Sequence, residues 1–177
     1  MAVFAVAGDD DDIIHAGVKH LADFLHMLGN PVAVIDSTGS TSMTRSLNLS
    51  YPLGILDVQR TLAVCAEDGV AAVIIAMNNA TLQREALESV NVDVLGSERV
   101  AQGEDVASLK TRYAFVSDRA LALTVPTGES DELAAESPAM FDQDRLGHMS
   151  LAVAMVLAAG VRRNNVRSAL RVANNLR

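Results

Sequence analysis

The residues best suited to chemistry lie in a turn that follows an apolar segment early in the sequence. Val3 to Ala7 are all apolar, Gly8 follows them, and Asp9, Asp10, Asp11 and Asp12 then lead into Ile13. In an α/β protein this is the place of a phosphate-binding loop, in which glycines, a lysine and a Ser or Thr hold nucleotide phosphates at a helix N-terminus. Four adjacent carboxylates would instead repel a triphosphate. The sequence therefore predicts a degenerate phosphate loop.

Three readings of this acidic turn, Asp9–Asp12, follow from elementary electrostatics. In the first interpretation the carboxylates have a purely structural role, because negative charge in a first helical turn interacts favourably with the helix dipole. The turn could also hold a hard cation such as Mg²⁺ or Ca²⁺, with Asp118 as a distant further ligand, in a metal-dependent phosphohydrolase. It lacks the glycine and distal glutamate of an EF-hand loop. A third possibility is that it meets an arginine-bearing surface.

Positive charge is concentrated in the last part of the sequence. All 22 acidic residues precede Arg145, together with only eight of the 14 Lys and Arg residues. From there on the sequence has no acidic residue and six arginines, namely Arg145, Arg162, Arg163, Arg167, Arg171 and Arg177. Nucleic-acid surfaces usually interleave lysine with aromatic residues, and this stretch has neither, so we expect no nucleic-acid partner. A basic helix that complements the chain's own acidic body, or that of a second copy, fits better. We predict an interaction surface on Arg162, Arg163, Arg167 and Arg171.

Composition is typical of one well-packed α/β domain over residues 1–177. Half of the residues are hydrophobic and a fifth are charged, which is enough for a buried core. The single cysteine, Cys65, favours a reducing compartment, and we interpret it as a small buried hydrophobe rather than a nucleophile. Because no basic, apolar, small-residue sequence precedes Gly8, we expect no signal peptide, and the longest apolar run, Leu151–Ala159, is too short for a bilayer. We expect a cytoplasmic protein without a membrane partner.

The other polar candidates carry weaker signals. His15, His20 and His26 are spaced five and six apart, not the three or four that place two ligands on one helix face, so we expect no metal there. For His148 we expect a capping or core role. The hydroxyl-rich segment Ser37–Ser42 could cradle an anion, but it has no lysine and no helix behind it, which favours an ordinary polar loop.

The periodicity of apolar residues alternates between strand and helix patterns. We expect strands at about 3–7, 32–35, 70–76, 92–95, 113–116 and 121–125, and helices at about 12–28, 55–68, 80–89, 146–159 and 163–175. Residues 37–52 fit a loop or a short edge hairpin, and Asn78 or Asn79 would cap the helix at 80–89. With right-handed crossovers, the pieces predict a three-layer α/β fold, in which a twisted, mainly parallel sheet has helices on both faces and two helices finish the chain.

The order of these segments resembles the central, ATP-binding domain of the Mur ligases, in the muramyl tripeptide synthetase branch. The similar segments are Leu56–Leu62, Glu67–Val73, Asn91–Val94 and the stretch from Gly147 through Leu170. The resemblance implies a P-loop-like fold. It also implies a substrate domain before this one and a third domain after it, for which we see no counterpart in the sequence.

Most of the family's catalytic positions are altered here. The resemblance places Asp12 at the phosphate-loop lysine and Ile13 at the metal-binding hydroxyl, while only Gly8 survives from the loop's glycines. Ala76 stands where the family has its magnesium-binding glutamate, and Ala80 where it has a histidine. The family's Asn-Asp-His sequence is absent from residues 96–101, and we see no counterpart of its carbamylated lysine.

These losses lead to one favoured function and two alternatives. We expect a noncatalytic Mur-ligase-like domain, a pseudoenzyme without cofactors. It would act as an interaction or scaffold protein that associates with itself or with a partner protein, in peptidoglycan or related peptide-ligase biology. The first alternative is an ATP- and Mg²⁺-dependent amide-forming ligase domain completed by partner chains. The second is the metal-dependent phosphohydrolase centred on Asp9–Asp12.

Overall fold

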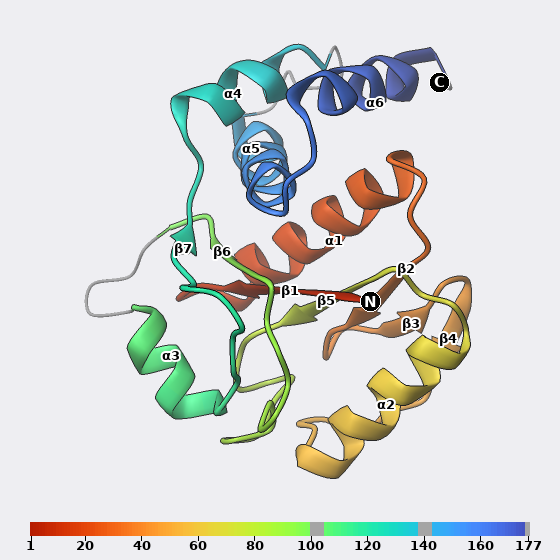
Figure 1. The fold of residues 1–177 in the computed structure, drawn as a ribbon, viewed down its shortest axis with the longest axis vertical. Helices are drawn as coiled ribbons and strands as arrows, with labels where there is room; N and C mark the ends of the chain where they lie inside the picture. The colour runs from red at the N-terminus through yellow and green to blue at the C-terminus, as the bar shows by residue number, and fades with distance from the viewer. Residues whose placement is uncertain (100–104, 138–142, 176–177) are drawn as a thin grey trace.

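The fold alternates strands and helices around one sheet. A computed structural model describes residues 1–99, 105–137 and 143–175 (Figure 1). Its strands are β1 (Ala2–Ala7), β2 (Val32–Ile35), β3 (Ser40–Ser42), β4 (Arg45–Leu47), β5 (Ala72–Ala76), β6 (Val94–Ser97) and β7 (Leu123–Thr124). Its helices are α1 (Asp11–Met27), α2 (Ile55–Glu67), α3 (Val106–Tyr113), α4 (Gly128–Ala135), α5 (Gln143–Ala158) and α6 (Arg163–Asn175).

The strands form one sheet in the order β4-β3-β2-β5-β1-β6-β7. The five strands from β2 to β7 in that order run parallel, and β3 and β4 add an antiparallel hairpin at one edge. Strand β1 lies inside the sheet, where Val3 pairs with Val73 of β5 and Phe4 pairs with Val94 of β6. A strand with parallel neighbours on both sides is covered on both faces, which explains its continuous apolar sequence.

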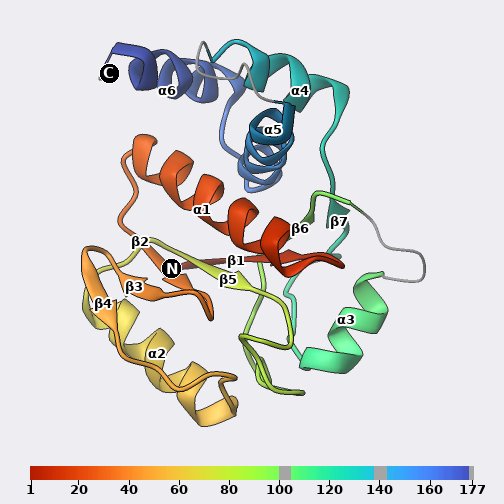
Figure 2. The ribbon, with the colours of Figure 1, turned by 180° about the vertical axis from the view of Figure 1, so that it is seen from behind.

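The helices divide between the two faces of the sheet, as Figures 1 and 2 show from opposite sides. Helices α1 and α5 cover one face, and α4 and α6 pack outside α5. Helices α2 and α3 cover the other face. Each face has its own hydrophobic core, with Leu21 and Met155 fully buried in the first and Val58 and Leu87 fully buried in the second. The predicted three-layer α/β fold with a mainly parallel sheet is therefore confirmed.

Helix α1 follows directly from its sequence pattern. Ile14, Val18, Leu21 and Leu25 recur at helical spacing, and each is at most 3% exposed. The helix ends before Gly29, whose φ of 87° is the left-handed conformation that glycine adopts freely. The helices predicted at 55–68, 146–159 and 163–175 are likewise present as α2, α5 and α6. Among the described residues, no helix combines the length and apolarity needed to cross a membrane.

The helix predicted at 80–89 is wrong. Residues 79–81 and 84–89 form turns, and Glu85 and Ser89 adopt φ values of 62° and 63°, which are incompatible with a right-handed helix. Long-range pairing outweighs the local pattern: Leu82 forms a bridge with Leu53, and the Leu87 N–H donates to the Tyr113 carbonyl. Asn78 does cap locally, accepting from the Thr81 N–H at 3.0 Å, but no helix follows.

The strand predicted at 113–116 is also wrong. Tyr113 ends α3, Ala114 turns the chain with φ 61°, and Val116 makes only an isolated bridge with Asn91. Tyr113 and Phe115 are both buried under the sheet, and two buried aromatic residues two positions apart give the alternating pattern that is typical of a strand. The strand predicted at 121–125 exists as the shorter β7, which pairs with β6. Helices α3 and α4 were not predicted.

Candidate functional site

The carboxyl ends of the parallel strands bring the polar candidates to one edge of the sheet. Strand β1 leads through α1 to β2, whereas its neighbour β6 leads through α3 to β7 on the other side. The connections that leave β1 and β6 therefore run in opposite directions along the sheet. Such a place is a topological switch point, and ligands of open α/β sheets bind in the crevice outside it. The turn Gly8–Asp12 and the segment Ser97–Glu98 border this point, because Ala7 and Ser97 are paired in the sheet.

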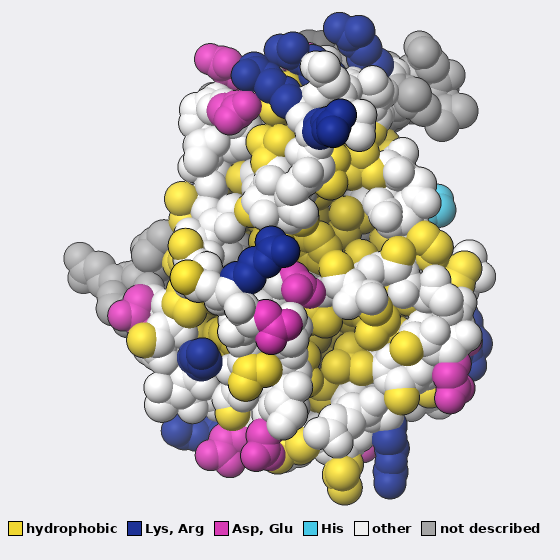
Figure 3. Space-filling model, in the orientation of Figure 1, with side chains coloured by type: hydrophobic (Ala, Val, Ile, Leu, Met, Phe, Trp, Pro, Cys, Tyr) yellow, Lys and Arg dark blue, Asp and Glu magenta, His cyan; other side chains and the backbone are white. Residues whose placement is uncertain are grey.

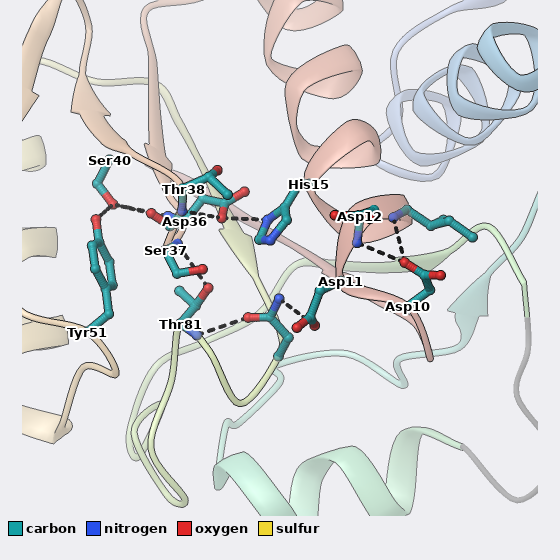
Figure 4. Close-up of polar contacts among 12 residues, drawn as sticks. Asp10, Asp11, Asp12, His15, Asp36, Ser37, Thr38, Ser40, Tyr51 and Thr81 are labelled. Carbon is teal, nitrogen blue, oxygen red and sulfur yellow. Dashed lines mark hydrogen bonds and ion pairs between the residues drawn. The ribbon is translucent and has the colours of Figure 1, made fainter.

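The acidic turn caps its own helix. Asp10 is the N-cap of α1, and its Oδ1 accepts hydrogen bonds from the Asp12 N–H at 2.9 Å and the Ile13 N–H at 3.3 Å. These amides belong to the first turn of the helix, whose N–H groups have no partner within it. In a phosphate-binding loop such amides donate to the phosphate. Here the protein's own carboxylate takes their hydrogen bonds (Figure 4).

Asp11 is engaged by the neighbouring strand. The Asn78 side-chain amide, which follows β5, donates to Asp11 Oδ1 at 3.0 Å. Thr81 extends this link, since its Oγ1 accepts from the Ser37 N–H at 3.1 Å, after β2. The loops after β1, β5 and β2 are therefore held together by side chains that lie far apart in the sequence. Asn78 is buried, and its side-chain amide connects the loops after β1 and β5.

A histidine–aspartate pair lies beside the acidic turn and was missed in the sequence. His15, on the second turn of α1, places Nδ1 2.7 Å from Oδ1 of Asp36, the residue after β2, although the ring nitrogen is not aligned for a hydrogen bond. The Asp36 side chain is only 4% exposed. Its Oδ1 also accepts from the Thr38 N–H at 3.1 Å, and Ser40 bonds its backbone. Figure 4 shows the two side chains turned toward one another.

A second histidine pair lies on the other side of α1. Nδ1 of His148, on α5, contacts Oε2 of Glu98, and both side chains are 13% exposed. The His20 ring of α1 lies against the His148 ring, with 5.2 Å between ring centroids. A Cβ at Gly147 would approach Glu98 Oε1 to 2.6 Å, so glycine is what allows the carboxylate to lie there. A core role was predicted for His148, and in the structure its side chain connects α5 with α1 and with the segment that follows β6.

The positions that the Mur ligase resemblance marks lie at this same edge. Ala76 ends β5 and is fully buried, Ala80 is exposed, and Ile13 is half-buried on α1. Residues 100 and 101 of the segment lacking Asn-Asp-His lie outside the described residues. Among the described residues, no three His, Cys, Asp or Glu side chains are grouped so that they could hold a metal ion.

The predicted arginine surface is partly occupied within the chain. Arg163 lies 3.3 Å from Glu129 Oε1, and Arg167 lies 3.1 Å from Glu136 Oε1, so α6 pairs with Glu129 of α4 and with the residue that caps the C-terminus of α4. In Figure 3, Lys or Arg side chains and Asp or Glu side chains lie near one another at the top of the molecule. Arg162 and Arg171 are exposed, and Arg177 lies outside the described residues. The sequence analysis predicted that the basic helix pairs with acidic residues of its own chain or of a second copy. Arg163 and Arg167 pair with acidic residues of their own chain.

Cys65 is fully buried on the opposite side of the sheet. Burial is the main cause that raises the pKa of its thiol above the ordinary value of 9.0, while a hydrogen bond with Ser42 acts in the other direction. A protonated, buried thiol behaves as a small apolar side chain, as the sequence analysis interpreted it.

The acidic turn can attract cations and accept hydrogen bonds, but two of its four carboxylates already bind partners within the chain, Asp10 at the helix amides and Asp11 at Asn78. All four aspartates are exposed. The edge therefore presents negative charge to solvent where a nucleotide-binding protein presents positive charge. When the chain is compared with known proteins, no protein-family model matches it and no curated protein is similar to it in sequence.

Proposed function

We propose that this chain is a noncatalytic Mur-ligase-like domain that acts by binding, as a self-associating interaction or scaffold protein of the cytoplasm. The observation that carries the proposal is the cap on α1. Asp10 accepts the hydrogen bonds of the amides at 12 and 13, which are the donors that a phosphate would need. A nucleotide would have to displace a carboxylate of its own chain and lose that cap.

Electrostatics supports the same conclusion. Two unit charges of the same sign about 5 Å apart repel by on the order of 3 kcal/mol at an effective dielectric constant of about 20. Asp9, Asp10, Asp11 and Asp12 are consecutive and exposed, so each adds to the repulsion that a triphosphate would meet. Phosphoryl transfer depends on positive groups that neutralise developing charge. This turn supplies the opposite sign.

Self-association is supported by charges that the fold leaves at the surface. The exposed aspartates of the turn and the exposed Arg162 and Arg171 lie on different parts of the molecule, and opposite charges steer two copies together. Arg163 and Arg167 contribute less to such a contact because Glu129 and Glu136 already pair with them. A role in peptidoglycan or related peptide-ligase biology rests on the Mur ligase resemblance.

Two measurements test this proposal. Isothermal titration with ATP and Mg²⁺ should give no binding heat at millimolar nucleotide, with a known ATP-binding protein measured in parallel as the positive control. Submillimolar ATP affinity would contradict the noncatalytic function. Light scattering after gel filtration should give a mass above that of one chain at low salt, and the mass should fall as salt is raised.

Charge reversal identifies the surfaces in contact. Asp12→Lys and Arg171→Asp should each weaken association, and an equimolar mixture of the two variants should restore it. Lys110→Glu on α3 is the matched control, since it also reverses one exposed charge. A monomer at every concentration and salt would refute self-association, and variants that weaken it without rescue on mixing would refute this pair of surfaces.

A further inference from the structure

A hollow lies between α1 and the β2–β3 edge of the sheet, and it extends from the His15–Asp36 pair toward the C-terminal end of α1. Side chains alternate along β2, so that Ala33 and Ile35 are buried in the core under α2 while Val32 and Val34 point to the α1 side. Thr41 of β3 lies in register with Val34 and also lines the hollow. These three side chains are only half-buried, because α1 borders this part of the sheet without covering it.

The hollow has the size of a small-molecule site. Its volume is about 790 Å³, within the range of roughly 300–1,000 Å³ that binds drug-sized ligands. Ala16 and Ala22 of α1 form one apolar wall, and Met43, 47% exposed at the hairpin turn, forms part of the other. The rim is polar, since Lys19 and Asp23 are exposed on α1. A concave, mostly apolar hollow with a few polar groups is typical of a small-molecule site.

One end of the hollow is chemically distinct. His15 and Asp36 line it, and Asp36 is the most deeply buried charged side chain among the lining residues. The described hydrogen bond and ion-pair contact of the Asp36 carboxylate both use Oδ1, with Thr38 and His15 as partners. Oδ2 takes part in neither. A ligand group that reaches this end meets a carboxylate acceptor next to an imidazole.

We propose that the hollow binds a small amphipathic molecule that carries a protonated amine. Its apolar body would lie on Val32, Val34 and Ala16, and its ammonium group would donate to Asp36 Oδ2. Charge complementarity selects the amine, because a buried carboxylate is compensated by a cation that donates hydrogen bonds. The formal net charge of −8 further raises the local concentration of cationic ligands. This site is independent of the proposed function of the acidic turn.

A series of ligands with one body and three head groups tests the proposal. Hexylamine, hexanol and hexanoate are titrated at neutral pH while the side-chain methyl groups are followed by NMR. Hexylamine should bind about fivefold more tightly than hexanol, a difference of about 1 kcal/mol, and hexanoate most weakly. Shifts should be confined to methyl groups at the hollow, such as those of Val34 and Met43. Equal or tighter binding of hexanoate would overturn the assignment of an amine, and shifts elsewhere would overturn the site.

Two variants separate the head group from the body of the site. Asp36→Asn keeps an acceptor for the Thr38 N–H but removes the charge, so the preference for hexylamine over hexanol should vanish. Thr41→Trp fills the hollow from the floor and should weaken all binding at least tenfold. Because the chain has no native tryptophan, the fluorescence of Trp in this variant also reports its folding. Leu56→Trp, on the 65% exposed position of α2 across the sheet, is the matched control and should bind like the wild type. Unchanged binding in Thr41→Trp would refute the site.

Discussion

Among the glycines that the structure describes, Gly96 is the one where an added Cβ would meet the closest atoms. It lies on β6 under α5, and a Cβ there would come within 2.8 Å of Met155 Cγ and 2.9 Å of Met155 Cε, and nearer still to its sulfur. Met155 is fully buried in the core between the sheet and α5. The Met155 side chain must shift to admit a new methyl group, and a close-packed interior resists that shift. Gly96→Ala should therefore destabilise the protein by overpacking rather than by any change in polarity.

The expected cost is about 1–3 kcal/mol, the usual range for an added methyl group in a filled core. For a domain of this size each kcal/mol lowers the melting temperature by about 2–4 °C. Urea denaturation followed by circular dichroism measures the change in the free energy of unfolding directly. Gly128→Ala is the matched control, since a Cβ at the start of α4 meets nothing within 4 Å. That variant should be neutral or up to about 1 kcal/mol more stable.

A double mutant separates overpacking from a loss of strand structure. Met155→Ala alone should cost about 2–5 kcal/mol because it leaves a cavity. Combined with Gly96→Ala, it removes the atoms that the new methyl group would meet. The double variant should then be more stable than the sum of the single effects by at least about 1 kcal/mol. Strict additivity, or a Gly96→Ala protein as stable as the wild type, would refute this account of the packing.

Three further predictions concern a cap, a titration and a thiol. Asp10→Ala should lower the free energy of unfolding by about 1 kcal/mol relative to Asp9→Ala, which removes the same charge but no cap; equal urea midpoints would contradict the capping role. The Ser108 N–H, which donates to Asp105 Oδ1 at 2.7 Å, is the main cause that holds the pKa of Asp105 below its ordinary 3.8. The ionised Asp105 carboxylate therefore stabilises the folded protein fully above pH 3.8, and this stabilisation is lost as the pH falls through the lower pKa of Asp105 in the folded state. The stability difference between wild type and Asp105→Asn should accordingly shrink between neutral pH and about pH 3 in urea titrations, and a constant difference would speak against it. Cys65 should stay unreactive toward Ellman's reagent in the native protein at mildly alkaline pH and react at once in denaturant, because it is buried and its pKa is raised; rapid native labelling would contradict its burial.

Much of the fold was accessible from local sequence patterns. Continuous apolar runs mark β1 and β5, and apolar residues at helical spacing mark α1 and α2. The errors fall where local and long-range signals conflict. Tyr113 and Phe115 alternate like strand residues, yet Tyr113 closes a helix that begins with the capping box of Asp105 and Ser108. Reading that box, and the similar one at Thr127 and Ser130, would have located α3 and α4.

The site was predictable only in part. The acidic turn was found because a strand, a glycine and a helix start are contiguous in sequence. The His15–Asp36 pair joins α1 to the end of β2, and it depends on which strands are neighbours. The Asn78–Asp11 contact spans 67 positions and depends on β5 lying next to β1. Residue types alone do not specify strand order, so these contacts required the structure.

The central position of β1 sets the timing of folding. Its partners β5 and β6 come much later in the chain, and the Val3 N–H donates to a carboxylate oxygen of Asp93, 90 positions away. On the ribosome, an apolar strand must therefore wait until most of the sheet has been made before it can pair. Such long-range closure slows folding and leaves β1 exposed to other chains meanwhile. We therefore expect the yield of folded protein to depend on how well β1 is protected during synthesis.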